Sequence, residues 1–115
     1  MSISYQGIGE WCASFACENV TEGQVVKAGG GCSADACSAG ELFCGVVRSV
    51  AHDGKACSVQ LGGLAEVAYS GESAPGVGYG KLSADGLGGV KVDANGMDCL
   101  VLAVDTAAKT AVIKL

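Results

Sequence analysis

Glycine is the feature of this sequence that most restricts its fold. The chain has 115 residues, of which 19 are glycine and one is proline. Glycine in a helix interior costs about 1 kcal/mol relative to alanine, so this content argues against a helical bundle. It is typical of a chain that turns often, because glycine adopts the left-handed backbone that tight turns need.

The segments between the glycines have the composition of β-strands. Short runs rich in Val, Leu and Ala recur roughly every 8–12 residues and are separated by turn signals such as Asp53-Gly54. We therefore predict an all-β fold, a small β-barrel or β-sandwich of about seven or eight short strands. Helix is expected only briefly, near residues 35–41 and 105–109. The strongest predicted strands lie at 43–50, 99–104 and 110–115.

The chain changes character near residue 23. Residues 1–22 show no sustained period of two or 3.6, so we predict an extended N-terminal arm there and a β-barrel or β-sandwich domain over 23–115. The arm carries Tyr5, Trp11 and Phe15, and free aromatic side chains of this size would be an exposed apolar liability. Two interpretations stay open: the arm docks on another protein, or it folds back on its own barrel.

The charge pattern limits the classes of partner. Twelve acidic residues stand against seven basic ones, and the basic residues are scattered singly. Binding to nucleic acid through phosphate neutralisation is therefore not expected. No apolar run approaches the ~18 residues that span a bilayer, and the first residues lack the pattern of a secretory signal. We expect a soluble protein that is made in the cytoplasm and binds no membrane.

Seven cysteines require an explanation, and four of them form two pairs at equal spacing. Cys12 and Cys17 are separated by four residues, as are Cys32 and Cys37. Four residues is the upper limit of the usual spacing between cysteine ligands in structural zinc sites. The only histidine is His52. A disulfide framework is the second interpretation, although the count is odd, and such bonds would form after assembly or lysis. Both interpretations of the two pairs stay open.

The sequence contains no recognisable catalytic constellation. Cys44, Cys57 and Cys99 lie in or beside predicted strands and are interpreted as small buried hydrophobic residues. His52 precedes a turn dipeptide, which favours a solvated turn histidine over a general base. The glycine-rich stretches lack the pattern of a phosphate-binding loop, and the acidic residues lack calcium-loop spacing. We predict a protein that is not an enzyme, with no cofactor and no metal.

Five short phrases follow one another from residue 22 to the end of the chain. The phrases are Glu22–Lys27, Phe43–Val47, Val59–Val67, Pro75–Val90 and Ala111–Leu115. Their order resembles that of a family of small bacteriophage proteins, the capsid decoration or head cement proteins. The resemblance covers about four fifths of the chain. The cysteine content of this chain and its aromatic N-terminal arm depart from the family.

The resemblance implies a structural virion protein that binds the outer surface of an assembled capsid, often as a homotrimer or beside neighbouring copies. Its partner would be the major capsid protein. We expect Tyr5, Trp11 and Phe15 to anchor the arm on the shell, because buried aromatic residues dominate many interfaces. The main alternative is a Cys-rich metal-binding or redox β-module. A carrier-type barrel and an adhesin or tail-associated β-domain are further alternatives.

Overall fold

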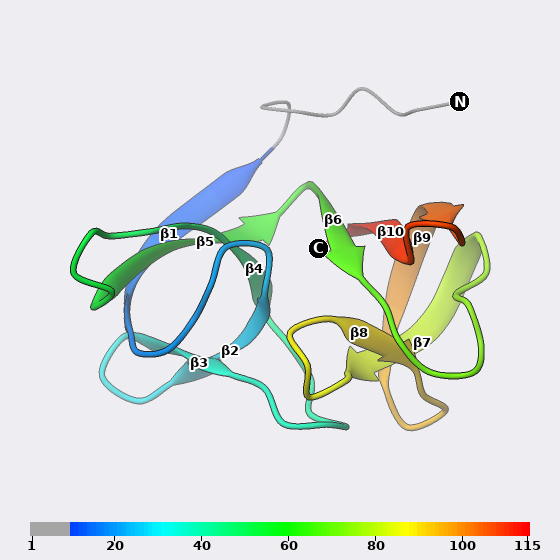
Figure 1. Cartoon of the computed structure of the whole chain (residues 1–115), viewed down its shortest axis with the longest axis horizontal. Coiled ribbons are helices and arrows are strands. Elements are labelled where there is room, and N and C mark those ends of the chain that lie inside the picture. The colour runs from blue at the N-terminus through cyan, green and yellow to red at the C-terminus, as the bar shows by residue number, and fades with distance from the viewer. Residues whose placement is uncertain (1–9) are drawn as a thin grey trace.

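The computed structural model describes residues 10–115 and folds into ten β-strands in two sheets (Figure 1). The first five strands close into a barrel in the order β1-β3-β2-β4-β5, and the other five form an open sheet in the order β6-β10-β9-β7-β8. The barrel strands are β1 (Trp11–Cys17), β2 (Val25–Gly29), β3 (Ser33–Ala36), β4 (Gly45–Val50) and β5 (Ala56–Gly62). The sheet strands are β6 (Leu64–Ala68), β7 (Gly78–Ala84), β8 (Val90–Val92), β9 (Met97–Asp105) and β10 (Thr110–Lys114).

The all-β prediction is confirmed, with a barrel and an open sheet side by side in one chain. The described part of the chain contains no helix, and its strands number ten where the sequence predicts seven or eight. The stretches 35–41 and 105–109, where the sequence allows a short helix, hold strand ends and turns.

The predicted boundary between residues 22 and 23 does not match the structure, because Trp11–Cys17 is a strand of the barrel. β1 pairs antiparallel with β5 over six residue pairs and parallel with β3, and these two contacts close the barrel. The alternation in β1 is hidden because apolar residues such as Trp11 and Ala16 are exposed. The first nine residues of the predicted arm lie outside the described residues.

Strands β2 and β4 are buried on both faces, and we call this pair the shared wall. Val26 and Val47 point into the barrel, whereas their neighbours Val25 and Val46 point outward and pack against the open sheet. All four are at most 2% exposed. A strand with two buried faces needs consecutive apolar residues, which explains the Val-Val doublet in each strand.

The shared wall separates two hydrophobic cores of different composition. The barrel core lies inside the closed strands and uses small side chains, whereas the sheet core lies between the shared wall and the open sheet and includes large ones. The barrel core consists of Cys17, Val20, Val26, Ala34, Val47, Cys57 and Val59. The largest members of the sheet core are Phe43, Tyr69, Leu82 and Ile113.

A buried glutamine fixes the passage from the barrel to the open sheet. Gln60 is fully buried, and its Nε2 donates to the carbonyl oxygens of Gly62 at 3.0 Å and Leu64 at 2.8 Å. Its Oε1 accepts a hydrogen bond from Arg48 Nη1 at 3.3 Å. Between the two sheets Gly63 takes a φ of 89°, so the bend predicted at Gly62-Gly63 is confirmed.

Candidate functional site

The structure separates the two members of each predicted cysteine pair. Cys12 and Cys17 stand on opposite faces of β1, Cys12 exposed and Cys17 in the barrel core. Cys32 precedes β3 and is exposed, whereas Cys37 follows β3 and belongs to the sheet core. Five steps along an extended strand span about 17 Å and reverse the face, so this spacing places neither pair on one metal ion or in one disulfide.

The two buried thiols of the barrel core are Cys17 and Cys57, and each is 5% exposed. Burial, and then the neighbouring Cys17 side chain, raise the pKa of the Cys57 thiol to about 11. The Cys17 thiol itself donates to the carbonyl oxygen of Gly54 at 3.6 Å. The structure therefore brings together one residue from a predicted pair and one that the sequence assigns to packing.

The strand register places these two residues on the same face. Phe15 is paired with Cys57, and the backbone N–H of Cys17 donates to the carbonyl oxygen of Lys55 at 3.0 Å. Cys17 and Cys57 are thus diagonal neighbours on the inner face of an antiparallel pair. They are 40 positions apart in the chain, and only the pairing of β1 with β5 reveals their proximity.

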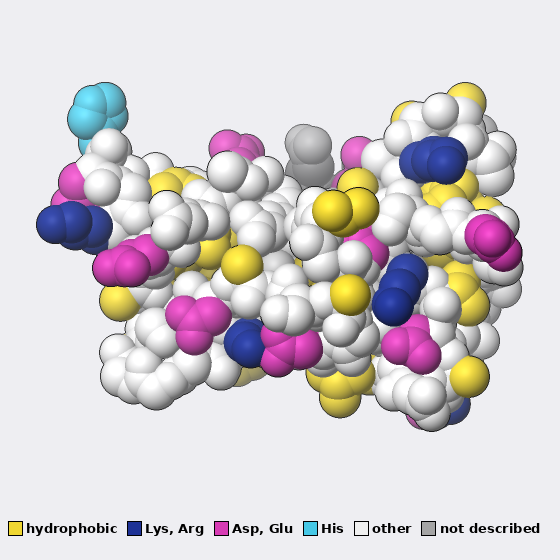
Figure 2. All heavy atoms as spheres, turned by 60° about the horizontal axis from the view of Figure 1, so that its bottom comes forward, with side chains coloured by type: hydrophobic (Ala, Val, Ile, Leu, Met, Phe, Trp, Pro, Cys, Tyr) yellow, Lys and Arg dark blue, Asp and Glu magenta, His cyan; other side chains and the backbone are white. Residues whose placement is uncertain are grey.

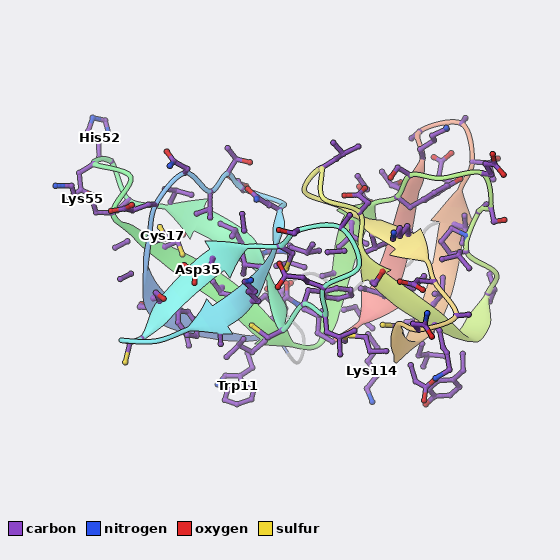
Figure 3. All side chains as sticks on the ribbon, turned by 90° about the horizontal axis from the view of Figure 1, so that it is seen from below. Trp11, Cys17, Asp35, His52, Lys55 and Lys114 are labelled. Atoms are coloured by element: carbon purple, nitrogen blue, oxygen red, sulfur yellow. The ribbon has the colours of Figure 1, made fainter. Side chains whose placement is uncertain are left out.

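A cavity of about 290 Å³ opens beside this thiol pair, at the end of the barrel. Figure 3 shows Cys17, Asp35 and Lys55 in the barrel half, with His52 projecting from the tip of the β4–β5 hairpin. Cys17 lines the cavity and Cys57 does not. The Lys55 ammonium and two carboxylates share its wall. The lining residues are Ala16, Cys17, Glu18, Ser33, Asp35 and Lys55.

Within residues 10–115, no three His, Cys, Asp or Glu side chains are arranged so that they could hold one metal ion. His52 is exposed in a turn, as the sequence predicts. Cys57 and Cys99 are buried in strands, which confirms their interpretation as packing residues. Cys44 differs: it is exposed and lies just before β4.

Several large apolar side chains are exposed on the outer surface. Leu87 is 83% exposed, Tyr79 is 78% and Val77 is 72%, and all three lie in or beside the β7–β8 hairpin. Of the predicted arm anchors, Trp11 is 65% exposed, while Phe15 is half-buried and packs against the barrel core. The third anchor, Tyr5, lies outside the described residues.

Charged side chains do not form a patch of one sign on the face in Figure 2, where basic groups stand singly among acidic ones. Lys27 Nζ lies 2.6 Å from Glu41 Oε2, and Lys81 Nζ lies 3.2 Å from Asp98 Oδ1. The hydrogen bond and the charge of Lys27 lower the pKa of Glu41. Much of the basic charge on this surface is thus paired locally.

No protein-family model matches this chain, and no curated protein matches it either. Among the described residues there is also no helix with the length and apolar character to cross a membrane. Two features with chemical or binding potential therefore stand out: the exposed apolar side chains around the β7–β8 hairpin, and the buried pair Cys17 and Cys57.

Proposed function

We propose that this protein is a capsid decoration protein that binds the outer surface of an assembled bacteriophage capsid and stabilises it. Its partner in this proposal is the major capsid protein, contacted by a homotrimer or by neighbouring copies of the chain on the virion. It acts by binding and carries out no catalysis. The proposal begins from the resemblance of the ordered phrases between residues 22 and 115.

The observation that carries the proposal is the exposure of large apolar side chains within one of those phrases. Val77, Tyr79 and Leu87 all belong to the phrase Pro75–Val90, and each is more than 70% exposed. Val77 and Tyr79 flank Gly78 at the start of β7, while Leu87 stands in the turn between the far end of β7 and β8. Large exposed apolar side chains on a small domain are candidate contact points for a partner.

The physical basis of stabilisation is preferential binding. A ligand that binds the assembled lattice better than the free subunits shifts the equilibrium towards the assembled lattice by mass action. Such a ligand needs a stiff surface with a few anchoring side chains, since a small number of buried aromatic and apolar residues dominate binding energy. The hairpin β7–β8 is held on β9 by five residue pairs, which gives Tyr79 a rigid base.

The direct test is to mix the purified chain with expanded empty capsids assembled from the major capsid protein of the same phage, and to image the particles. We expect protrusions at defined lattice points. Tyr79→Ala combined with Leu87→Ala should weaken binding at least tenfold, whereas Leu42→Ala, which removes an exposed apolar group from another part of the surface, should not. Bare shells would contradict capsid binding, and equal affinities of both variants would contradict the assigned surface.

The alternative is a Cys-rich metal-binding or redox module, and the presence of two buried thiols, Cys17 and Cys57, in one small core is the observation that favours its redox form. The two functions are separated by the metal content of the purified chain and by its stability in chelator. Stoichiometric zinc or iron, with unfolding on chelation, would favour the metal module. A metal-free chain that stays folded in chelator would remove that form.

A further inference from the structure

We propose that the outer face of the open sheet is the surface that contacts the capsid shell, and that Lys114 within it pairs with a carboxylate set among apolar groups of the shell. This inference rests on the proposed function, and it adds the face of contact and the chemistry of the partner. We call this surface the outer face. It consists of Leu64, Tyr79, Leu100, Leu102, Val112 and Lys114.

One row of cross-strand neighbours runs over four strands of the open sheet. Leu64 on β6 lies opposite Lys114 on β10, and Lys114 lies opposite Leu100 on β9. Leu100 in turn lies opposite Tyr79 on β7. Residues directly opposite in antiparallel strands direct their side chains to the same face, with Cβ atoms about 5 Å apart. Tyr79 is 78% exposed, so this row lies on the face of the sheet that is turned to solvent.

The apolar side chains of the outer face contribute to neither hydrophobic core. The neighbours of Leu100 on β9, Cys99 and Val101, both belong to the sheet core, so Leu100 points to the opposite side of the strand. The same alternation on β10 directs Val112 outward. An antiparallel sheet with one solvated face normally carries polar residues on that face. Half-buried leucines that pack against neither core are Leu64, Leu100 and Leu102.

Lys114 is exposed and is the unpaired cation of the outer face. Lys81, two residues beyond Tyr79, is held by Asp98 at 3.2 Å. Among the described residues no carboxylate lies within ion-pair distance of Lys114 Nζ, and this includes Glu66 on β6. Residues 1–9 contain no Asp or Glu. The positive charge of Lys114 is therefore available to a partner.

The surroundings of Lys114 define the chemistry of that partner. A partner that covers the row also covers the ammonium group, because leucine stands on either side of it. A wholly apolar partner would leave a buried charge without a counter-ion, which is costly, whereas a carboxylate in that place compensates it. A nucleic-acid backbone does not fit, since the chain has a net charge of -5 and this face offers one unpaired lysine. The charge of the face thus favours an acidic side chain among apolar ones on a protein surface.

Trp11 extends the apolar contact onto the barrel half. Figure 3 shows Trp11 and Lys114 projecting from the same side of the molecule, with Lys55 and His52 at the far end of the barrel. Trp11 is 65% exposed and is paired with Gly62, close to the passage from β5 into β6. Two exposed aromatic residues, Trp11 and Tyr79, therefore stand at either end of the proposed contact, where such residues commonly anchor an interface.

The test measures binding of the full chain to expanded empty capsids, assembled from the major capsid protein of the same phage, over a range of salt concentrations. Lys114→Glu places a like charge against the shell carboxylate and should weaken binding about fiftyfold. Lys114→Gln should weaken it about tenfold and make it less sensitive to salt. The matched control is Lys55→Glu, which makes the same change in net charge on an exposed residue at the far end of the barrel and should leave the affinity within about twofold.

A second variant tests the apolar part of the row with the charge intact. Leu100→Thr keeps a residue that suits a strand, and it should weaken binding about fivefold with the salt dependence unchanged. Thermal melts of each variant check that the fold is retained. Bare shells with the unaltered chain would contradict capsid binding and this inference together. Shells that bind the unaltered chain and both Lys114 variants equally well would overturn this inference alone and leave capsid binding standing.

Discussion

The barrel core and the sheet core are filled by side chains of different sizes. The seven buried residues of the barrel core are Val, Ala and Cys, with Phe15 only half-buried at its border. The sheet core buries Phe43, Tyr69, Leu82 and Ile113. The two cores meet at the shared wall, where adjacent valines belong to different cores.

We attribute this difference in side-chain size to the closure of the barrel. Strands that close into a small barrel enclose a space of fixed width, so its interior admits only side chains that fill that space. The second sheet is not a closed barrel, although Tyr69 just after β6 bridges Val90 in β8, and larger side chains fill the space between this sheet and the shared wall. Cysteine, a small apolar side chain, suits the closed interior, and two of the seven barrel-core residues are cysteines.

The largest effect is expected from opening the barrel. Deletion of residues 1–20 removes β1, which pairs with both β3 and β5, and also removes Val20 from the barrel core. The barrel strands β3 and β5 would lose their closing partner and expose their inner faces to water. We expect loss of the cooperative thermal transition, followed by circular dichroism.

The matched control for this deletion is removal of residues 1–9, which takes away none of the ten strands. That shorter deletion should keep the cooperative transition. A chain of residues 21–115 that unfolds as cooperatively as the full chain would show that closure is not what holds the barrel core together.

A smaller effect should distinguish the two cores directly. Ala34 and Ala111 are each 1% exposed, one in the barrel core and one in the sheet core. Overpacking costs typically 1–3 kcal/mol, and the closed barrel has less freedom to relax. We expect Ala34→Leu to lower the free energy of unfolding by about 3 kcal/mol and Ala111→Leu by about 1 kcal/mol, measured in urea. Equal losses would mean that the open sheet is as rigid as the barrel.

The smallest effect concerns the turns. Aspartates accept backbone N–H groups in the turns of the sheet at Asp85, Asp93 and Asp105, and Asp53 does the same in the barrel hairpin. The Asn95 N–H and then the Ser83 hydroxyl lower the pKa of Asp93. A carboxyl with a lowered folded pKa stabilises the fold above its unfolded pKa and loses that contribution as pH falls through the folded value.

We therefore expect the Asp93→Asn variant to melt a few degrees below the unaltered chain at pH 7. This difference in melting temperature should disappear as the pH falls below 3.8, the ordinary pKa of an aspartate side chain. Thermal melts of both proteins between pH 7 and pH 2 measure the gap. The comparison variant is Asp53→Asn in the barrel hairpin, where one backbone N–H, that of Lys55, meets the carboxylate. A gap that stays constant with pH would assign the effect of Asp93 to something other than its charge.

The sequence was sufficient to predict the strand content and most turns, because those depend on neighbouring residues. Asp53-Gly54, Asn95-Gly96 and the bend at Gly62-Gly63 all lie where strands end or begin. The strand β1 was not predicted because apolar side chains lie on both of its faces. The division into a barrel and an open sheet was not predicted for a related reason. Burial on two faces removes the alternation of apolar and polar residues from β2 and β4.

The candidate sites were less predictable, because both depend on contacts between distant segments. Spacing in the sequence pairs Cys12 with Cys17, but an extended strand moves them apart and the register of β1 on β5 brings Cys57 to Cys17 instead. Exposure of Val77 and Tyr79 depends on which face of β7 packs on the sheet core, which local composition does not determine.

The shared wall has a consequence for how this molecule comes apart. Each strand of the shared wall contributes side chains to both cores. Unfolding of either half would therefore remove part of the core of the other half. We expect a single calorimetric transition, with amide protons of the barrel and of the open sheet exchanging through the same global opening. Two lobes that look separable in Figure 1 would then behave as one cooperative unit.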